Sequence, residues 1–288
     1  MSWEQSFQEI IAEADASGLA CSPAAAGIAC AGLGAIDEKY GPESAKPLAH
    51  HNVPHALDVM RRGIRLANIL QPYIDEKYRE DLSDLIIVGG AYHDYEQSEG
   101  FGVNEKESAD ASLRAIDESP EKPWRDIERF KARAHLGIMA TEIAIKPNGE
   151  IVQVNLCNGG SDPLKYIMAF ADINGIAMEG AERMLEDCAN LCKERYGDVF
   201  NEQVLSEFLE TQPFFLRTRL HERRIKADLA YYFLDDMPVI YDELTKAFGG
   251  NAAEASIYAK LLKSDPLALL AVASRIMKVK SILPLNKK

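Results

Sequence analysis

The feature that most constrains this chain is an apolar run that ends in two polar residues. Leu85–Gly90 has no polar side chain, and Ala91-Tyr92-His93-Asp94 follows it directly. The run closes a longer segment, 75–92, whose apolar residues have helical spacing. A helix that is apolar all round is buried in the protein interior. The segment therefore delivers His93 and Asp94 to an interior site, and the rest of the chain has to enclose that site.

Nearly every other periodic segment also has helical spacing. Residues Phe7, Ile10 and Ile11 share one face of the first segment, and Ser22-Pro23 is typical of a helix cap and first turn. Only residues 146–161 read as a short hairpin or an irregular excursion. We predict an all-α fold, a single helical bundle over residues 1–288, with helices over residues 3–14, 23–40, 54–69, 75–92, 104–118, 123–145, 162–171, 177–196, 201–233, 238–248, 252–262 and 266–279.

Length and charge exclude several classes of protein. The 288 residues suffice for a sizeable core, and no linker rich in serine, glycine or proline divides them. The 45 acidic and 32 basic side chains give a net charge of −13, which excludes nucleic acid as a main partner. No long apolar stretch lacks a charge, so no membrane partner is expected. The five cysteines form no CxxC pair, which favours a reducing compartment and a cytoplasmic location.

Two further stretches supply polar groups that match His93 and Asp94. The first is His51-Asn52-Val53-Pro54-His55, and the second is Phe170-Ala171-Asp172. Pro54 favours a helix that starts between the two histidines, so His51 and His55 need not do the same job. A lone histidine is more often a core or surface residue than a ligand. Imidazoles and carboxylates that recur in order on apolar helices favour a divalent metal site instead.

At these residues the chain resembles a known superfamily. His51-Asn52-x-x-His55-Ala-x-Asp58-Val59 looks like the HNxxHAxDV signature of class I cyclic nucleotide phosphodiesterases. His93-Asp94 with Asp172 resembles the H…HD…D pattern of the HD superfamily of metal-dependent phosphohydrolases. Residues 104–109, 138–142 and 170–174 resemble the NEExSA, LATD and ADLSNP segments. The resemblance covers about 49–216 and implies an HD-type bundle, with helical extensions over residues 1–48 and 217–288.

The resemblance also implies a division of roles among the metal ligands. His55, His93, Asp94 and Asp172 would ligate a first divalent ion, and Asp94 would bridge to a second. Zn, Fe, Mn, Co or Mg would suit such a ligand set. The implied reaction is phosphoester hydrolysis by a metal-activated hydroxide. Asp94 is therefore both a ligand and a catalytic residue.

Around the ligands the resemblance assigns supporting residues. His51 would be the general acid that protonates the departing oxygen, and Asn52 and Asp58 would orient the histidines from outside the ligand set. Gln212-Pro-Phe-Phe215 has the QxxF spacing that holds a purine, with Gln212 reading the base edge and Phe215 stacking on it.

The chain departs from the phosphodiesterase pattern around the second metal. Phosphodiesterases continue HDxxH, whereas this chain has Gln97 at the last position. The histidine that follows the LATD segment has no counterpart either, because Ile145 and Lys146 occupy that region. An acidic residue from Glu96, Glu99, Glu105 or Glu107 could compensate, and the bacterial NEExSA pattern favours Glu105 and Glu107.

Three functions remain open from the sequence. The first is a phosphodiesterase-like hydrolase of a nucleotide-like small molecule. The second is a nucleotidase or polyphosphate-type hydrolase with the same ligands. The third is a degenerate HD domain that binds a nucleotide or metal as a sensor, which Gln97 favours and the intact His51 disfavours.

Overall fold

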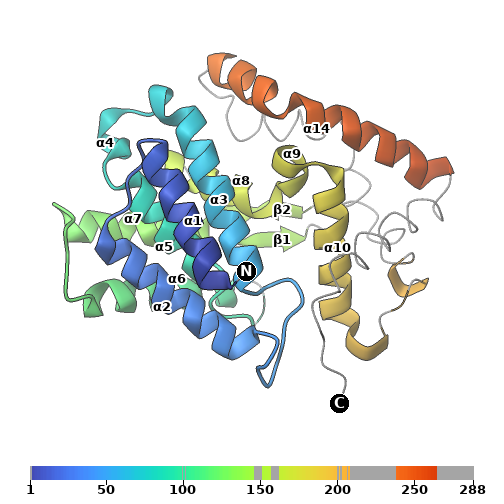
Figure 1. The fold of residues 1–288 in the computed structure, drawn as a ribbon, viewed down its shortest axis with the longest axis horizontal. Helices are drawn as coiled ribbons and strands as arrows, with labels where there is room; N and C mark the ends of the chain where they lie inside the picture. The colour runs from blue at the N-terminus through green and yellow to red at the C-terminus, as the bar shows by residue number, and fades with distance from the viewer. Residues whose placement is uncertain are drawn as a thin grey trace. The chain divides into compact units, whose positions relative to one another are not determined.

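The structure is a computed structural model that describes residues 2–98, 100, 102–145, 151–156, 162–199, 201, 203–205, 207 and 238–264. The described part is helical apart from one small sheet, which confirms the prediction of an all-α fold (Figure 1). The helix predicted over 266–279 and most of the one predicted over 201–233 lie outside the described residues. Among the helices of the described ranges, none is both long and apolar enough to span a membrane.

Packing divides the chain into two compact units. Unit 1 consists of residues 1–145 and 152–173, and unit 2 consists of residues 146–151 and 174–288. All four predicted first-metal ligands belong to unit 1. Because one domain can contain more than one compact unit, the prediction of a single domain over residues 1–288 stays a prediction.

Helix α5 (Leu82–Tyr92) is the centre of unit 1, and every one of its residues is buried. It packs against α2 (Pro23–Tyr40), α3 (Val53–Leu70), α6 (Val103–Glu118), α7 (Ile127–Met139) and α8 (Pro163–Ile173). Helix α1 (Trp3–Ala16) packs on α3. The close approach of α2 to α5 requires a glycine, because a Cβ on Gly32 would lie 2.6 Å from Cε2 of Tyr92. The apolar run of the sequence is therefore the core of the bundle.

A buried carboxylate fixes the start of α5. Asp84 accepts hydrogen bonds from the backbone N and Oγ of Ser22, both at 2.7 Å, and from Nε1 of Trp124 at 2.8 Å. Ser22 also caps α2, as predicted. Asp84 thus joins the beginnings of two core helices, and this fixes the direction in which α5 runs toward His93.

Residues 75–92 were predicted to form one continuous helix, and this prediction is wrong. The structure has α4 (Glu76–Arg79), after the short helix η1 (Gln71–Tyr73), and a separate α5. Between them Asp81 adopts a left-handed conformation with φ of 59°, which interrupts the helical hydrogen bonds. Aspartate tolerates this conformation better than most residues, so no glycine or proline marks the break in the sequence.

The helix predicted over 123–145 is too long at both ends. The Asp126 side chain caps α7 by accepting from the backbone N of Arg129, and Thr141 Oγ1 donates to the Ile138 carbonyl just beyond the last turn. The chain then forms β1 (Ile143–Ile145), which pairs with β2 (Ile151–Gln153) before the short helix η2 (Val154–Leu156). Of the two alternatives predicted for residues 146–161, a hairpin or an irregular excursion, the paired strands favour the hairpin, but β1 lies before the predicted range.

Unit 2 differs from the prediction at two glycine positions. Gly180, with φ of 92°, separates α9 (Gly175–Glu179) from α10 (Ala181–Tyr196) and so splits the helix predicted over 177–196. A short helix, η3 (Gly197–Val199), follows α10. Helix α14 (Pro238–Ser264) instead continues through the sequence Gly249-Gly250, where a break was predicted. Asn251 Nδ2 donates to the Ala177 carbonyl at 2.7 Å, and this contact holds the glycine-rich turn of α14 in place.

Candidate metal centre

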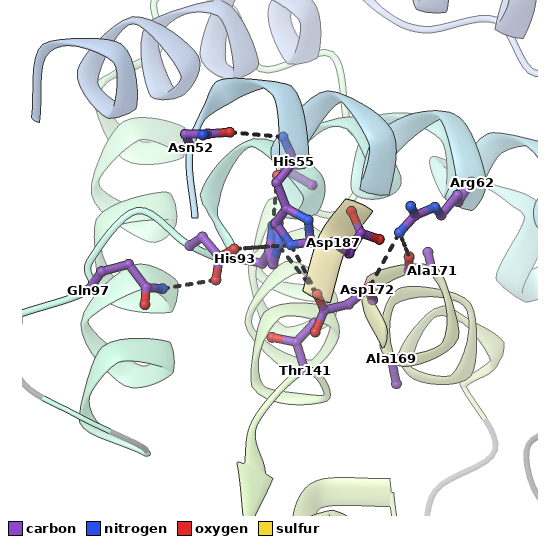
Figure 2. Close-up of polar contacts among 12 residues, drawn as sticks. Asn52, His55, Arg62, His93, Gln97, Thr141, Ala169, Ala171, Asp172 and Asp187 are labelled. Carbon is purple, nitrogen blue, oxygen red and sulfur yellow. Dashed lines mark hydrogen bonds and ion pairs between the residues drawn. The ribbon is translucent and has the colours of Figure 1, made fainter. Parts of the chain in front are cut away.

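Three helices of unit 1 bring the predicted ligands together. Asn52 caps α3 and accepts from the backbone N of His55 at 3.3 Å, which places His55 in the first turn. His93 is the residue that caps the C-terminal end of α5, with Asp94 directly after it, and Asp172 lies in the last turn of α8. Figure 2 shows His55, His93 and Asp172 turned toward one another. Residues far apart in the sequence thus form one cluster.

The cluster has the spacing of a metal site. His55 Nε2 lies 3.2 Å from Oδ1 of Asp172 and 3.3 Å from Oδ2 of Asp94. His93 Nε2 lies 3.0 Å from Oδ2 of Asp94 and 3.8 Å from Oδ1 of Asp172. Ligands at about 2.0–2.2 Å from an ion are themselves roughly 3–4 Å apart. His55, His93 and Asp172 therefore have the spacing of metal ligands, with Asp94 beside both imidazoles, and the role of the four side chains as ligands stays a prediction.

The buried polar atoms of this cluster face one another. His93 Nδ1 donates to the Gly90 carbonyl at 2.9 Å, which directs the other ring nitrogen, Nε2, toward Asp94. Nε2 of His93 and Oδ2 of Asp94 are both buried and meet as an ion pair at 3.0 Å. A cation bound beside them would take both atoms as ligands, so these residues fit a metal ligand set.

Mutual charge holds the cluster in its ionised form. Burial lowers the pKa of His55, but hydrogen bonds and charge from Asp172 and Asp94 outweigh it and raise the pKa to about 10. The pKa of His93 is also raised, because the charge of Asp94 outweighs burial. Burial raises the pKa of Asp94, but the positive charges of His93 and His51 hold it well below its usual range. In this form the protonated imidazoles balance the negative charge of the two carboxylates.

A buried arginine that the sequence analysis did not identify positions Asp172. Arg62 of α3 is 1% exposed, and its Nη1 donates to the carbonyls of Ala171 at 3.1 Å and Asp172 at 3.4 Å (Figure 2). These carbonyls lie at the C-terminal end of α8, where a positive charge is favourable. Since α3 also carries His55, Arg62 ties two ligand-bearing helices together.

Replacing Arg62 by methionine should therefore weaken both folding and metal binding. We expect the free energy of unfolding to fall by roughly 2–4 kcal/mol, because two helix carbonyls lose a buried charged donor. Metal affinity should fall about 10–100-fold, as is typical when a residue behind the ligands is lost. Urea denaturation and metal titration measure the two effects. Arg65→Met, at an exposed position of the same helix, is the control, and an unchanged metal affinity in folded Arg62→Met would contradict the positioning role.

The predicted supporting residues lie around the cluster in different ways. His51 lies just before α3 in a half-buried position, with its ring centroid 6.0 Å from that of His55. His50, to which we assigned no role from the sequence, lies closer, with its ring centroid 4.4 Å from that of His55. Asp58 lies on α3 with a carboxylate oxygen 3.6 Å from Nη1 of Arg61, and its orienting role stays a prediction.

The remaining predicted residues divide into two groups. Gln97 touches the cluster, since its Nε2 donates to Oδ1 of Asp94 at 2.9 Å (Figure 2). Glu105 is in the first turn of α6, where its carboxylate accepts from the backbone N of Gly102 at 2.7 Å. Burial, with the charges of Glu142 and Asp94, raises the pKa of Glu105. Gln212 and Phe215 lie outside the described residues.

Comparison of the chain with protein-family models, with curated proteins and with solved structures finds no match.

Proposed function

We propose that this chain is a metal-dependent phosphohydrolase that hydrolyses a phosphoester of a nucleotide-like small molecule. The observation that carries the proposal is the cluster of His55, His93 and Asp172, which has metal-ligand spacing, with Asp94 at 3.3 and 3.0 Å from the two imidazoles. The resemblance to the HD superfamily supplies the reaction class. The proposal includes a cytoplasmic location, which the free cysteines Cys21, Cys30, Cys188 and Cys192 support.

In this proposal each residue of the site has a separate task. His55, His93, Asp94 and Asp172 hold a divalent ion, which when bound supplies Lewis acidity toward water and phosphoryl oxygens. His51, outside the ligand set, donates a proton to the departing ester oxygen, a role worth about 10²–10⁴-fold in rate. Asn52 caps α3 and thereby fixes His51 and His55 relative to each other. By the resemblance, Gln212 and Phe215 bind the base of the substrate.

Metal analysis followed by a substrate panel tests the proposal. We expect the purified protein to contain a tightly held transition metal and to hydrolyse at least one member of a panel of cyclic nucleotides, nucleoside monophosphates and nucleoside diphosphates. Cleavage of cyclic nucleotides supports the phosphodiesterase-like reading, and cleavage of phosphomonoesters or anhydrides supports a nucleotidase-type enzyme. Binding of metal and nucleotide without turnover would favour a sensor over an enzyme.

A further inference from the structure

The two oxygens of Asp94 have different partners. Oδ2 faces the imidazole nitrogens of His55 and His93, at 3.3 and 3.0 Å, where the proposed ion would lie. Oδ1 accepts a hydrogen bond from Nε2 of Gln97 at 2.9 Å. An ionised carboxylate only accepts hydrogen bonds, so the amide must present its NH₂ group to Asp94. Gln97 thus places the positive end of a neutral dipole on the oxygen that would bridge to a second cation.

Gln97 is held firmly in this position by its neighbours. Its backbone N donates to Oη of Tyr40 at 3.0 Å and to Oε1 of Glu96 at 2.9 Å. Glu96 is fixed in turn by Oη of Tyr40 at 3.0 Å and Oγ of Ser98 at 2.6 Å. Glu96 is therefore committed to supporting the Gln97 backbone.

Among the described residues, two other carboxylates that could hold a second ion have partners of their own, and Glu99 lies outside these residues. Glu105 accepts from Gly102, and Glu142 accepts from Nδ2 of Asn155 at 2.7 Å. Glu107 is exposed on α6. Within the described residues, the only cluster of histidine, cysteine and acidic side chains with metal-ligand spacing contains His55, His93 and Asp172.

From these contacts we infer that the centre holds one divalent ion and that Gln97 excludes a second. The inference rests on the proposed function, because it needs the first ion. It replaces the pair of ions that the resemblance implies by a single ion between His55, His93, Asp94 and Asp172. Gln97 is then a positioning residue that reserves Asp94 Oδ2 for that ion.

Metal stoichiometry tests the inference without any activity measurement. The full chain is stripped with a chelator and titrated with Mn²⁺, while elemental analysis and electron paramagnetic resonance count and characterise the bound ions. We expect one equivalent in the unmodified protein, with a mononuclear six-line spectrum. Gln97→Glu has the same shape but replaces the donor by a carboxylate, and it should bind two equivalents with a spin-coupled spectrum. Gln97→His should do the same, and Gln71→Glu, at the far end of α3 from His55, should still bind one.

Each outcome has a distinct meaning. Two equivalents in the unmodified protein would overturn the inference and leave the proposed function intact. One equivalent in Gln97→Glu and also in Gln97→His, with both variants folded by circular dichroism, would overturn the role of Gln97. A chain that binds no Mn²⁺, Zn²⁺, Co²⁺ or Fe²⁺ would overturn the metal site itself, and both proposals with it.

Discussion

Replacing Asp94 by asparagine is expected to abolish tight metal binding and phosphoester hydrolysis together. The substitution keeps the shape of the side chain but removes the charge that faces both imidazoles. Tight protein-metal binding is worth roughly 10–16 kcal/mol, so each of four ligands contributes roughly 3–4 kcal/mol, or about 10²–10³-fold in affinity. Titration of the chelator-treated protein with Zn²⁺ or Mn²⁺, monitored by calorimetry, measures the change in the dissociation constant.

A matched variant separates loss of a ligand from loss of charge. Asp110 of α6 pairs with Nζ of Lys106 at 2.6 Å on the protein surface, outside the cluster. Asp110→Asn removes the same charge and should bind metal as the unmodified protein does. Hydrolysis that persists in Asp94→Asn, or equal metal affinities in the two variants, would be incompatible with a metal-dependent mechanism at this site.

Helical spacing and the polar ends of helices predicted most of unit 1. The apolar run 85–90 predicted the buried α5, and Pro54, now in the first turn of α3, predicted that this helix begins between His51 and His55. These two predictions place His55 and His93 at helix ends. The convergence of Asp172 depended on the family resemblance, because spacing alone does not say which helix ends meet in space.

The errors in the fold come from tertiary contacts that a local pattern does not contain. Asp81 breaks a periodic segment through its own left-handed conformation, with no turn residue beside it. Gly249 and Gly250 resemble a helix end. Asn251, however, donates to the Ala177 carbonyl of α9, and Glu254 accepts from the backbone N of Ala181 at the start of α10, and these bonds hold α14 continuous. Glycine lowers helix propensity by only about 1 kcal/mol, which two such contacts offset.

The sequence contains a pattern that could have identified Arg62 as a buried residue. An arginine beside another arginine reads as part of a solvated helix face. Yet Arg62 shares its register with His55, Val59 and Leu66, all of them buried on α3. A charged residue on the apolar stripe of a helix that also carries a ligand is expected to have a buried partner. Nothing in the sequence indicated that this partner would be the end of α8.

Metal binding is expected to release protons and to strengthen as the pH rises. The carboxylates of Asp172 and Asp94 raise the pKa of His55 to about 10, so this imidazole is protonated at neutral pH when no metal is bound. An ion can bind only the neutral ring, and each proton displaced makes the apparent affinity increase about tenfold per pH unit. Between pH 6.5 and pH 8.5 we expect a rise of at least about 100-fold, since the pKa of His93 is raised as well.

The raised pKa of His55 also makes the stability of the metal-free protein depend on pH. This stability falls as the pH rises, whereas metal affinity increases. The stabilisation from protonated His55 is fully present below the ordinary pKa of 6.5 and is lost as the pH rises through about 10. Calorimetric titration in buffers of different ionisation enthalpy counts the protons released, and urea denaturation without metal follows the stability. His135→Asn on α7, outside the cluster, should leave both profiles unchanged. Metal binding without proton release at pH 7 would mean that His55 is neutral in the metal-free site and that the two carboxylates do not hold it protonated.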